Sequence, residues 1–357
     1  MSLSPLTEGT NMRVGIAGFA GSGKSTVFHW LTGVKPDPAA RERGQVGMAK
    51  IPDERLTWLS EHFKPKKTTP ATIEFIDTPG LLLSERRDNP RRLAILRDAG
   101  GLLVVLSGYG VGDPADELRR FREELLFADL EVLTNRINRL GDQAKKPKPA
   151  KEREADQQES ALLQRITHAL EQGQPASGLG LKEEEEKAVR SFQLLTLKPV
   201  VVFLNISDER IGQPPPPALL PLASHLIQAP VKLELELEEL AFEDRQTFMH
   251  DLGLSGSSRD GTLRTIYAAM GQMVFFTVGE DECRAWGLRK GATAVEGAGQ
   301  VHTDLARGFV RAEVVRFEDF KKVGSMKEAK THGVYRLEGK TYIVKDGDIM
   351  HILAGHA

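Results

Sequence analysis

Residues 18–25 read GFAGSGKS, and this stretch decides the fold because it fits the pattern G-x-x-x-x-G-K-[ST]. An apolar run at residues 14–17 precedes it, and Val27, Phe28 and Leu31 follow it with the spacing of an amphipathic helix. A phosphate-binding loop needs this order of strand, loop and helix. The flanking sequence therefore favours a nucleotide-binding loop over a glycine-rich turn that carries Lys-Ser by chance.

The residue types in this loop suit a bound phosphate chain. Glycines allow main-chain N–H groups to turn toward phosphate oxygens, and the N-terminus of the following helix adds a partial positive charge. We expect Lys24 to reach the β and γ phosphates as a catalytic group, and Ser25 to bind Mg²⁺. The predicted nucleotide-binding residues of the loop are Gly18, Gly21, Ser22, Gly23, Lys24, Ser25 and Thr26.

A second motif occurs at residues 73–80, which read IEFIDTPG and end an apolar strand in D-x-P-G. Asp77 is expected to hold the Mg²⁺ shell through water, and the main-chain N–H of Gly80 to sense the γ-phosphate as a second catalytic group. An ordinary turn at a strand end carries similar residues. It explains less well why the motif follows a phosphate loop.

A third motif, NISD at residues 205–208, ends the apolar run at residues 199–205, where GTPases carry N-K-x-D. Asn205 and Asp208 are predicted to contact the base, because a carboxylate accepts hydrogen bonds from the two guanine N–H groups. Ile206 replaces the lysine. It is expected to cover a face of the base without contributing a charge.

Composition limits the class of protein. The chain has 357 residues, 40% of them hydrophobic, a formal charge of −2 and one cysteine, Cys283. These values predict two or three globular domains in a reducing compartment. We expect a cytoplasmic protein, since the first residues lack a secretory signal and no segment approaches the ~18 apolar residues of a membrane span. The scattered histidines do not predict structural zinc.

Three regions are expected along the chain. Residues 12–116 and 192–272 alternate apolar strands with helices and predict a parallel sheet covered on both faces. Residues 117–191 predict an inserted antiparallel helical hairpin that turns at the Lys- and Pro-rich residues 145–149. Its heptad seam comprises Leu126, Leu130, Leu133, Ile137, Leu140, Leu163, Ile166 and Leu170. Residues 273–357 carry short β-like runs and predict a small separate domain.

The C-terminal region carries a family resemblance. Residues 301–304 (VHTD), 307–314 (RGFVRAEV) and 342–348 (YIVKDGD) resemble the C-terminal signature of the YchF family, also called Obg-like ATPases. Further matches occur at residues 64–66 (KPK), 70–72 (PAT) and 275–277 (FFT). With the three motifs and the hairpin, the similarity extends from Arg13 over nearly the whole chain.

The resemblance implies a P-loop GTPase-like parallel-sheet domain, an inserted coiled-coil hairpin and a C-terminal β-grasp TGS domain. It also implies a Mg²⁺-dependent protein that slowly hydrolyses GTP or ATP and associates with ribosomes. Family members lack the glutamine that orients water after D-x-x-G, and Leu81 occupies that place here. RNA contact is expected through the hairpin turn and through Arg311, Lys321, Lys322 and Lys327.

The chain departs from the family in two segments. Residues 34–46 (VKPDPAARERGQV) contain no Ser or Thr that could complete Mg²⁺ coordination and feel the γ-phosphate, which predicts slower hydrolysis. Residues 84–92 (SERRDNPRR) replace a glycine-rich stretch. An arginine there could act on transition-state charge, although such a run is more often a solvated face or a contact for RNA.

Base choice is a third departure, because Asp208 replaces the usual Glu. Facing adenine, Asp208 would oppose the N1 lone pair, at a cost of about 1–3 kcal/mol if both groups are desolvated. This geometry leans toward GTP, whereas the family leans toward ATP.

Two functions stay open at this point. One is a slow regulatory nucleoside triphosphatase that docks to the ribosome. The other is a nucleotide-gated ribosome- or RNA-binding module with little or no hydrolysis. A small-molecule kinase is disfavoured, because the base motif and the C-terminal region have no place in it.

Overall fold

The computed structural model describes residues 12–84, 86–110, 112–251 and 258–355. The chain divides into two compact units. The first unit comprises Arg13–Gly47 and Phe75–Ser257, and the second comprises Met1–Met12, Met48–Glu74 and Ser258–Ala357. The predicted domain boundaries remain predictions. The packing units differ from them at residues 48–74, which pack with the C-terminal region.

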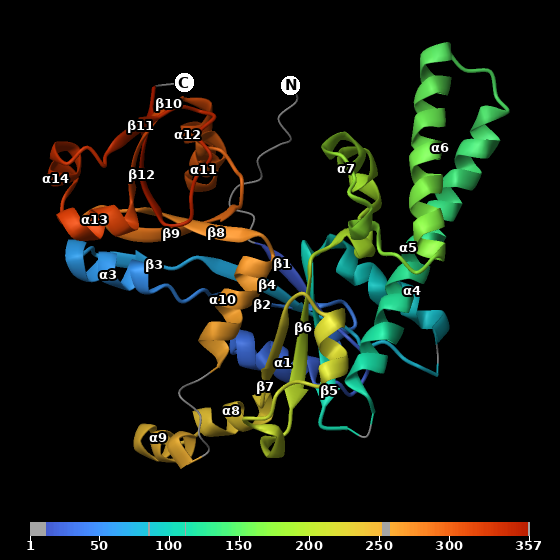
Figure 1. The fold of residues 1–357 in the computed structure, drawn as a ribbon, viewed down its shortest axis with the longest axis horizontal. Coiled ribbons are helices and arrows are strands. Elements are labelled where there is room, and N and C mark those ends of the chain that lie inside the picture. The colour runs from blue at the N-terminus through green and yellow to red at the C-terminus, as the bar shows by residue number, and fades with distance from the viewer. Residues whose placement is uncertain (1–11, 85, 111, 252–257, 356–357) are drawn as a thin grey trace. The chain divides into compact units, whose positions relative to one another are not determined.

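The first sheet has six strands in the order β2-β4-β1-β5-β6-β7 (Figure 1). The pairs β1–β5, β5–β6 and β6–β7 are parallel. The strands are β1 (Arg13–Ala17), β2 (Gln45–Lys50), β4 (Thr72–Asp77), β5 (Gly101–Gly108), β6 (Val200–Ile206) and β7 (Leu226–Ala229). Three of them, β1, β4 and β6, confirm the strands predicted from the apolar runs that carry the three motifs. Their continuous burial follows from a sheet covered on both faces.

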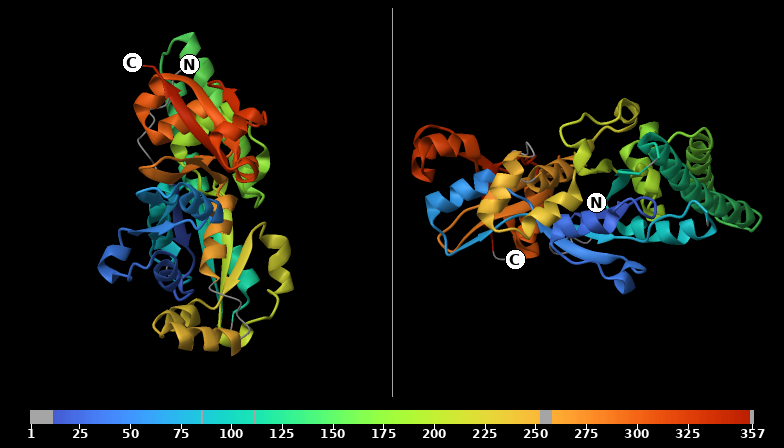
Figure 2. Two further views of the ribbon diagram at one scale, coloured as in Figure 1. Left: turned by 90° about the vertical axis from the view of Figure 1, so that its left-hand side faces the viewer. Right: turned by 90° about the horizontal axis from the view of Figure 1, so that it is seen from below.

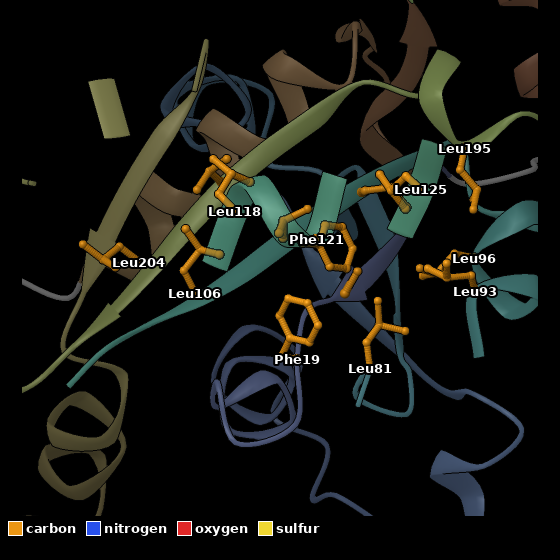
Figure 3. Packing of buried hydrophobic residues seen from close by; sticks show 14 of the residues in the cluster. Phe19, Leu81, Leu93, Leu96, Leu106, Leu118, Phe121, Leu125, Leu195 and Leu204 are labelled. Atoms are coloured by element: carbon orange, nitrogen blue, oxygen red, sulfur yellow. The ribbon is translucent and has the colours of Figure 1, made fainter. Parts of the chain in front are cut away.

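The helices of the first unit include the one that follows the phosphate loop. They are α1 (Lys24–Thr32), α2 (Pro38–Arg41), α4 (Asn89–Ala94), α5 (Pro114–Ala144), α6 (Ala150–Glu171), α7 (Glu183–Val189), α8 (Val231–Glu238) and α9 (Phe242–Asp251). A buried apolar cluster joins β1, β5 and β6 to α4 and α5 (Figure 3). Within it, the rings of Phe19 and Phe121 meet edge to face at 6.2 Å between centroids.

The predicted hairpin is formed by α5 and α6, which lie side by side in Figure 1 and in the right-hand view of Figure 2. Asp113 caps α5 by accepting a hydrogen bond from the N–H of Ala115. The heptad seam is confirmed, because its five most buried members form one cluster: Leu133, Leu140, Leu163, Ile166 and Leu170. Leu126, Leu130 and Ile137 pack against that cluster. The chain leaves α5 at Ala144 and re-enters helix at Ala150, so the turn falls at the predicted prolines.

The second unit has its own sheet, in the order β11-β10-β12-β8-β9-β3. Its strands are β3 (Lys67–Thr69), β8 (Gln272–Thr277), β9 (Glu282–Arg289), β10 (Phe309–Arg316), β11 (Arg336–Glu338) and β12 (Asp348–Ala354). Its helices are α3 (Glu54–Phe63), α10 (Arg259–Ala269), α11 (Ala294–Val301), α12 (Thr303–Arg307), α13 (Phe317–Val323) and α14 (Met326–Thr331). None of the helices within the described ranges is long and apolar enough to cross a membrane.

Within residues 48–74, helix α3 and strand β3 belong with the second sheet. Strand β3 pairs in parallel with residues 282–284 of β9. The indole of Trp58 on α3 packs edge to face against Phe317 and Phe320 of α13, at 5.6 and 6.3 Å between ring centroids. An early segment of the chain therefore completes the C-terminal core.

The C-terminal signature residues have structural roles in this unit. The buried carboxylate of Asp348 accepts hydrogen bonds from the Tyr342 hydroxyl at 2.8 Å and the Lys345 N–H at 2.9 Å. The ring of His302 caps α12, because its Nδ1 accepts a hydrogen bond from the N–H of Asp304 at 3.2 Å. These contacts hold turns and a helix end in place.

Candidate functional site

The phosphate loop between β1 and α1 requires glycine at three positions. Gly18, Gly21 and Gly23 have φ angles of 143°, 86° and 90°. A Cβ at Gly18 would lie 2.4 Å from the carbonyl oxygen of Val105, and a Cβ at Gly23 would lie 2.2 Å from Asn205 Nδ2. Backbone conformation therefore disfavours larger residues at all three positions, and lack of space also excludes them at Gly18 and Gly23.

Side chains hold several carbonyl oxygens of the loop. The donors are Lys24 Nζ to Phe19 O (2.7 Å), the Tyr109 hydroxyl to Gly21 O (2.6 Å) and Asn205 Nδ2 to Ser22 O (3.4 Å). The first N–H groups of any helix have no acceptor inside that helix, and α1 begins at Lys24. With its carbonyls engaged by protein donors, the loop offers main-chain N–H groups to an anion.

The D-x-P-G segment is attached to this loop. The Thr78 hydroxyl donates to the carbonyl of Ile16 at 2.7 Å. The Leu81 N–H donates to Gly18 O at 3.0 Å, and the Ala20 N–H donates to Leu81 O at 2.9 Å. The two motifs that are far apart in sequence therefore form one hydrogen-bonded unit.

Gly80 lies directly beside the phosphate loop. A Cβ at Gly80 would lie 2.7 Å from Ala20 N and 2.8 Å from Lys24 Nζ, so this position also requires glycine. Asp77 is fully buried at the end of β4. The structure thus brings Lys24, Asp77 and Gly80 together at one edge of the sheet. Their chemical roles remain predictions.

Leu81, at the position of the missing glutamine, is 3% exposed. Its side chain belongs to the same apolar cluster as Phe19 and Phe121 (Figure 3). A side chain in this core cannot orient an attacking water.

Two arginines of the segment at residues 84–92 make contacts within the protein. Arg86 forms an ion pair with Glu124 of α5, whose side chain is 8% exposed. Arg92 Nη1 donates to the carbonyl oxygen of Gly80 at 2.7 Å. The Arg92 side chain therefore holds the backbone of the D-x-P-G loop.

Residues 34–46 are held together by hydrogen bonds within the segment. The Gln45 side chain accepts from the Asp37 N–H at 2.7 Å and donates to Lys35 O at 2.8 Å. Asp37 also caps the short helix α2 through the N–H of Ala39. These bonds stabilise a loop that has no hydroxyl side chain to offer a metal.

The predicted base motif lies beyond the end of β6. Asn205 is buried against the phosphate loop, and Asp208 is exposed at the start of a short turn, Asp208–Arg210. Ile206 is 6% exposed and belongs to the apolar cluster. It packs in the core, and its expected contact with a base remains a prediction.

Two residues beside the loop, Tyr109 and Glu117, were not found from the sequence. A Glu117 carboxylate oxygen accepts from the N–H of Ser107 at 3.0 Å. Burial raises the pKa of Glu117, while this hydrogen bond and the charge of Lys24 lower it. The sheet topology could have identified them. Strand β5 pairs in parallel with β1, so the C-terminal end of β5 must lie beside the phosphate loop.

A cavity of about 340 Å³ lies on this side of the loop. Its lining includes Ala20, Gly21, Ser22, Leu83, Ser107 and Glu117. The Ser22 hydroxyl is buried and makes no hydrogen bond within the described residues.

The donors present fit Mg²⁺ bound together with a nucleotide. Mg²⁺ is usually held by one or two carboxylates and substrate phosphates, without a full protein cage. Ser25 at the start of α1 and Asp77 at the end of β4 supply a hydroxyl and a carboxylate. Across the described ranges, no group of three or more His, Cys, Asp or Glu side chains could hold a metal alone.

A glycine-rich loop between a parallel strand and a helix, hydrogen-bonded to a D-x-x-G loop, defines a P-loop NTPase of the GTPase type. Comparisons with known proteins agree. Residues 13–147 match the family model described as "50S ribosome-binding GTPase", and residues 273–354 match YchF-GTPase_C. The chain belongs to the YchF family.

Individual relatives match along nearly their whole length. The "Ribosome-binding ATPase YchF" of Bacillus subtilis is 33% identical over 95% of this chain and 98% of the relative. The protein of the same name from Haemophilus influenzae is 34% identical over the same shares. The structure of the Schizosaccharomyces pombe YchF GTPase superimposes with a TM-score of 0.82 at 27% identity, covering 97% of this chain and 99% of that chain. These matches confirm the predicted family and fold class.

The loop geometry makes a prediction for Gly23→Ala. The added Cβ would displace Asn205, and alanine would be strained at the positive φ of this position. Purine nucleotide affinity should therefore fall at least about 100-fold. Fluorescent GDP and ADP titrations measure this. Gly178→Ala, where a Cβ meets nothing within 4 Å, is the matched control and should bind like the parent protein. Equal affinity of both variants would contradict the assignment of the loop.

Proposed function

We propose that this protein binds a purine nucleoside triphosphate with Mg²⁺, hydrolyses it slowly, and docks to the ribosome. The observation that carries this proposal is the hydrogen-bonded pair of phosphate loop and D-x-P-G loop, with Lys24 and Gly80 in contact range. The printed names of the relatives, which are ribosome-binding ATPases, support the same reading.

The chain's own groups suit stabilisation of charge on a transferring phosphoryl group. Lys24 and the N–H groups of the loop would bind the phosphate oxygens, and the N–H of Gly80 would face the γ-phosphate. Ser25 and Asp77 would hold Mg²⁺, which neutralises charge on the β and γ phosphates when bound. Leu81 is buried, so no side chain at that position activates water. Hydrolysis should therefore be slow.

Lys24→Ala tests the enzymatic part. Removing the ammonium should lower steady-state phosphate release from GTP or ATP by at least about 100-fold, and EDTA should do the same to the parent protein. A malachite-green assay, with and without ribosomes, measures this release. Release from the parent protein no greater than from Lys24→Ala would refute hydrolysis.

That outcome would favour the second candidate, a nucleotide-gated binding module. The observation behind it is the self-bonded segment at residues 34–46, which has no Ser or Thr to bind Mg²⁺. The module would bind nucleotide and ribosome and would not turn over.

Base choice follows from the exposed carboxylate of Asp208. Asp208 matches the two N–H groups of guanine and opposes N1 of adenine, so GTP is the favoured ligand. Ile206, buried in the core, adds no charge to this choice.

Asp208→Glu tests base choice. The longer side chain withdraws its carboxylate from the guanine-reading position, so the ratio of ADP to GDP dissociation constants should fall about 10-fold. Glu209→Asp, at the neighbouring exposed carboxylate, is the control and should leave the ratio unchanged. An unchanged ratio in Asp208→Glu would show that Asp208 does not read the base.

The ribosomal contact is proposed through basic side chains. In the second unit Lys321, Lys322 and Lys327 are exposed. In the hairpin turn Lys145 pairs with Asp142 and Lys148 pairs with Asp156, so these two lysines are partly neutralised. Lys322 of the second unit likewise pairs with Asp319, at 3.8 Å, and the proposed contact uses both surfaces. Association with ribosomes would place the protein in the cytoplasm.

Replacing Lys321, Lys322 and Lys327 by Ala should weaken co-sedimentation with ribosomes. The slope of log affinity against log salt should become shallower by about 2–3, because three phosphate contacts would be lost. Lys290→Ala with Lys340→Ala removes two other exposed lysines of the same unit as a control. An unchanged slope in the triple variant would exclude this surface.

A further inference from the structure

Tyr109 contacts the phosphate loop from a neighbouring strand. It follows the C-terminal end of β5, which pairs in parallel with β1, so the two strands end beside each other. Its hydroxyl donates to the carbonyl oxygen of Gly21 at 2.6 Å. A Cβ at Gly23 would lie 3.2 Å from the same hydroxyl oxygen. The phenol therefore lies against the centre of the loop.

Besides the bond from Tyr109, a main-chain hydrogen bond from Ser22 N–H to Phe19 O, at 3.3 Å, holds the loop at this point. Gly21 is exposed, and a Cβ there would meet nothing within 4 Å. Its φ of 86° is a conformation that glycine adopts without penalty but does not favour strongly. The hydrogen bond from Tyr109 fixes the direction of the Gly21 carbonyl. Together with the bond from Ser22 N–H to Phe19 O, it orients the peptide between Gly21 and Ser22 within the loop.

The base motif cannot provide a cation here. The position that carries lysine in N-K-x-D is Ile206, which is buried in the apolar cluster. Tyr109 supplies a neutral donor on the same side of the loop as Asn205, whose amide holds the next carbonyl, that of Ser22.

The phenol also stays protonated. Burial raises the pKa of Tyr109, a hydrogen bond with Ser107 lowers it, and the charge of Glu117 raises it. The group therefore remains a donor and adds no negative charge beside a phosphate chain.

We propose that Tyr109 is a positioning residue that holds the phosphate loop in its anion-binding shape through the Gly21 carbonyl. This inference rests on the proposed nucleotide binding. Because the contact is to the loop backbone, Tyr109 should strengthen the binding of any polyphosphate, whatever its base.

Tyr109→Phe is the decisive variant, because it removes one hydroxyl and keeps the ring. The dissociation constants of GDP, ADP and tripolyphosphate should each rise about 10-fold, with the change mainly in the dissociation rate. The tyrosine is 48% exposed, so the thermal midpoint of the free protein should stay within about 2 °C of the parent. Tyr335→Phe, a phenol of the second unit, is the control and should leave all three constants unchanged.

The outcomes separate the two proposals. If the parent protein binds none of the three ligands, the proposed function itself fails. If the parent binds and Tyr109→Phe binds equally well, Tyr109 does not position the loop. A loss confined to one purine, with tripolyphosphate unaffected, would also overturn the proposal, since it would mean that the hydroxyl contacts the base.

Discussion

Two main-chain hydrogen bonds, from Leu81 to Gly18 and from Ala20 to Leu81, join the phosphate loop to the loop after β4. The geometry of the site depends on them, because they set Gly80 beside Lys24. Both bonds use backbone atoms of Leu81, and this leaves its side chain to enter the core beside Phe19. The contact that joins the two motifs therefore directs the Leu81 side chain into the core.

What remains around the phosphates is mostly backbone. Lys24, Tyr109 and Asn205 each hold a loop carbonyl, and Arg92 holds the carbonyl of Gly80. Such donors orient the loop dipoles before a ligand arrives, which is how a fixed polar environment stabilises developing charge. The arrangement suits the binding of a phosphate chain, because these donors hold the loop in one shape.

The central strands of the first sheet could be predicted, because β1, β5 and β6 are mostly apolar runs and two of the motifs lie at the ends of β1 and β6. The heptad seam from Leu133 to Leu170 could also be predicted, since apolar residues at heptad spacing are typical of two helices that pack against each other. Strand β3 was not predictable: it has three residues, and its partner β9 lies more than two hundred residues later. The burial of Ile206 was also missed, because the motif indicates a position near the base but not the direction of a side chain. Tyr109 and Arg92 act on backbone carbonyls, and such contacts leave no residue pattern.

The route of the chain has a practical consequence for dissecting this molecule. Between Gly47 and Phe75 the polypeptide leaves the first unit, supplies α3 and β3 to the other core, and returns just ahead of Asp77. A truncated protein that ends before β8 would still contain Trp58 and β3, but without the strand and aromatic rings they pack against. An isolated C-terminal fragment would lack its sixth strand for the same reason. The two halves are interleaved along the gene, and no single cut separates them into intact pieces.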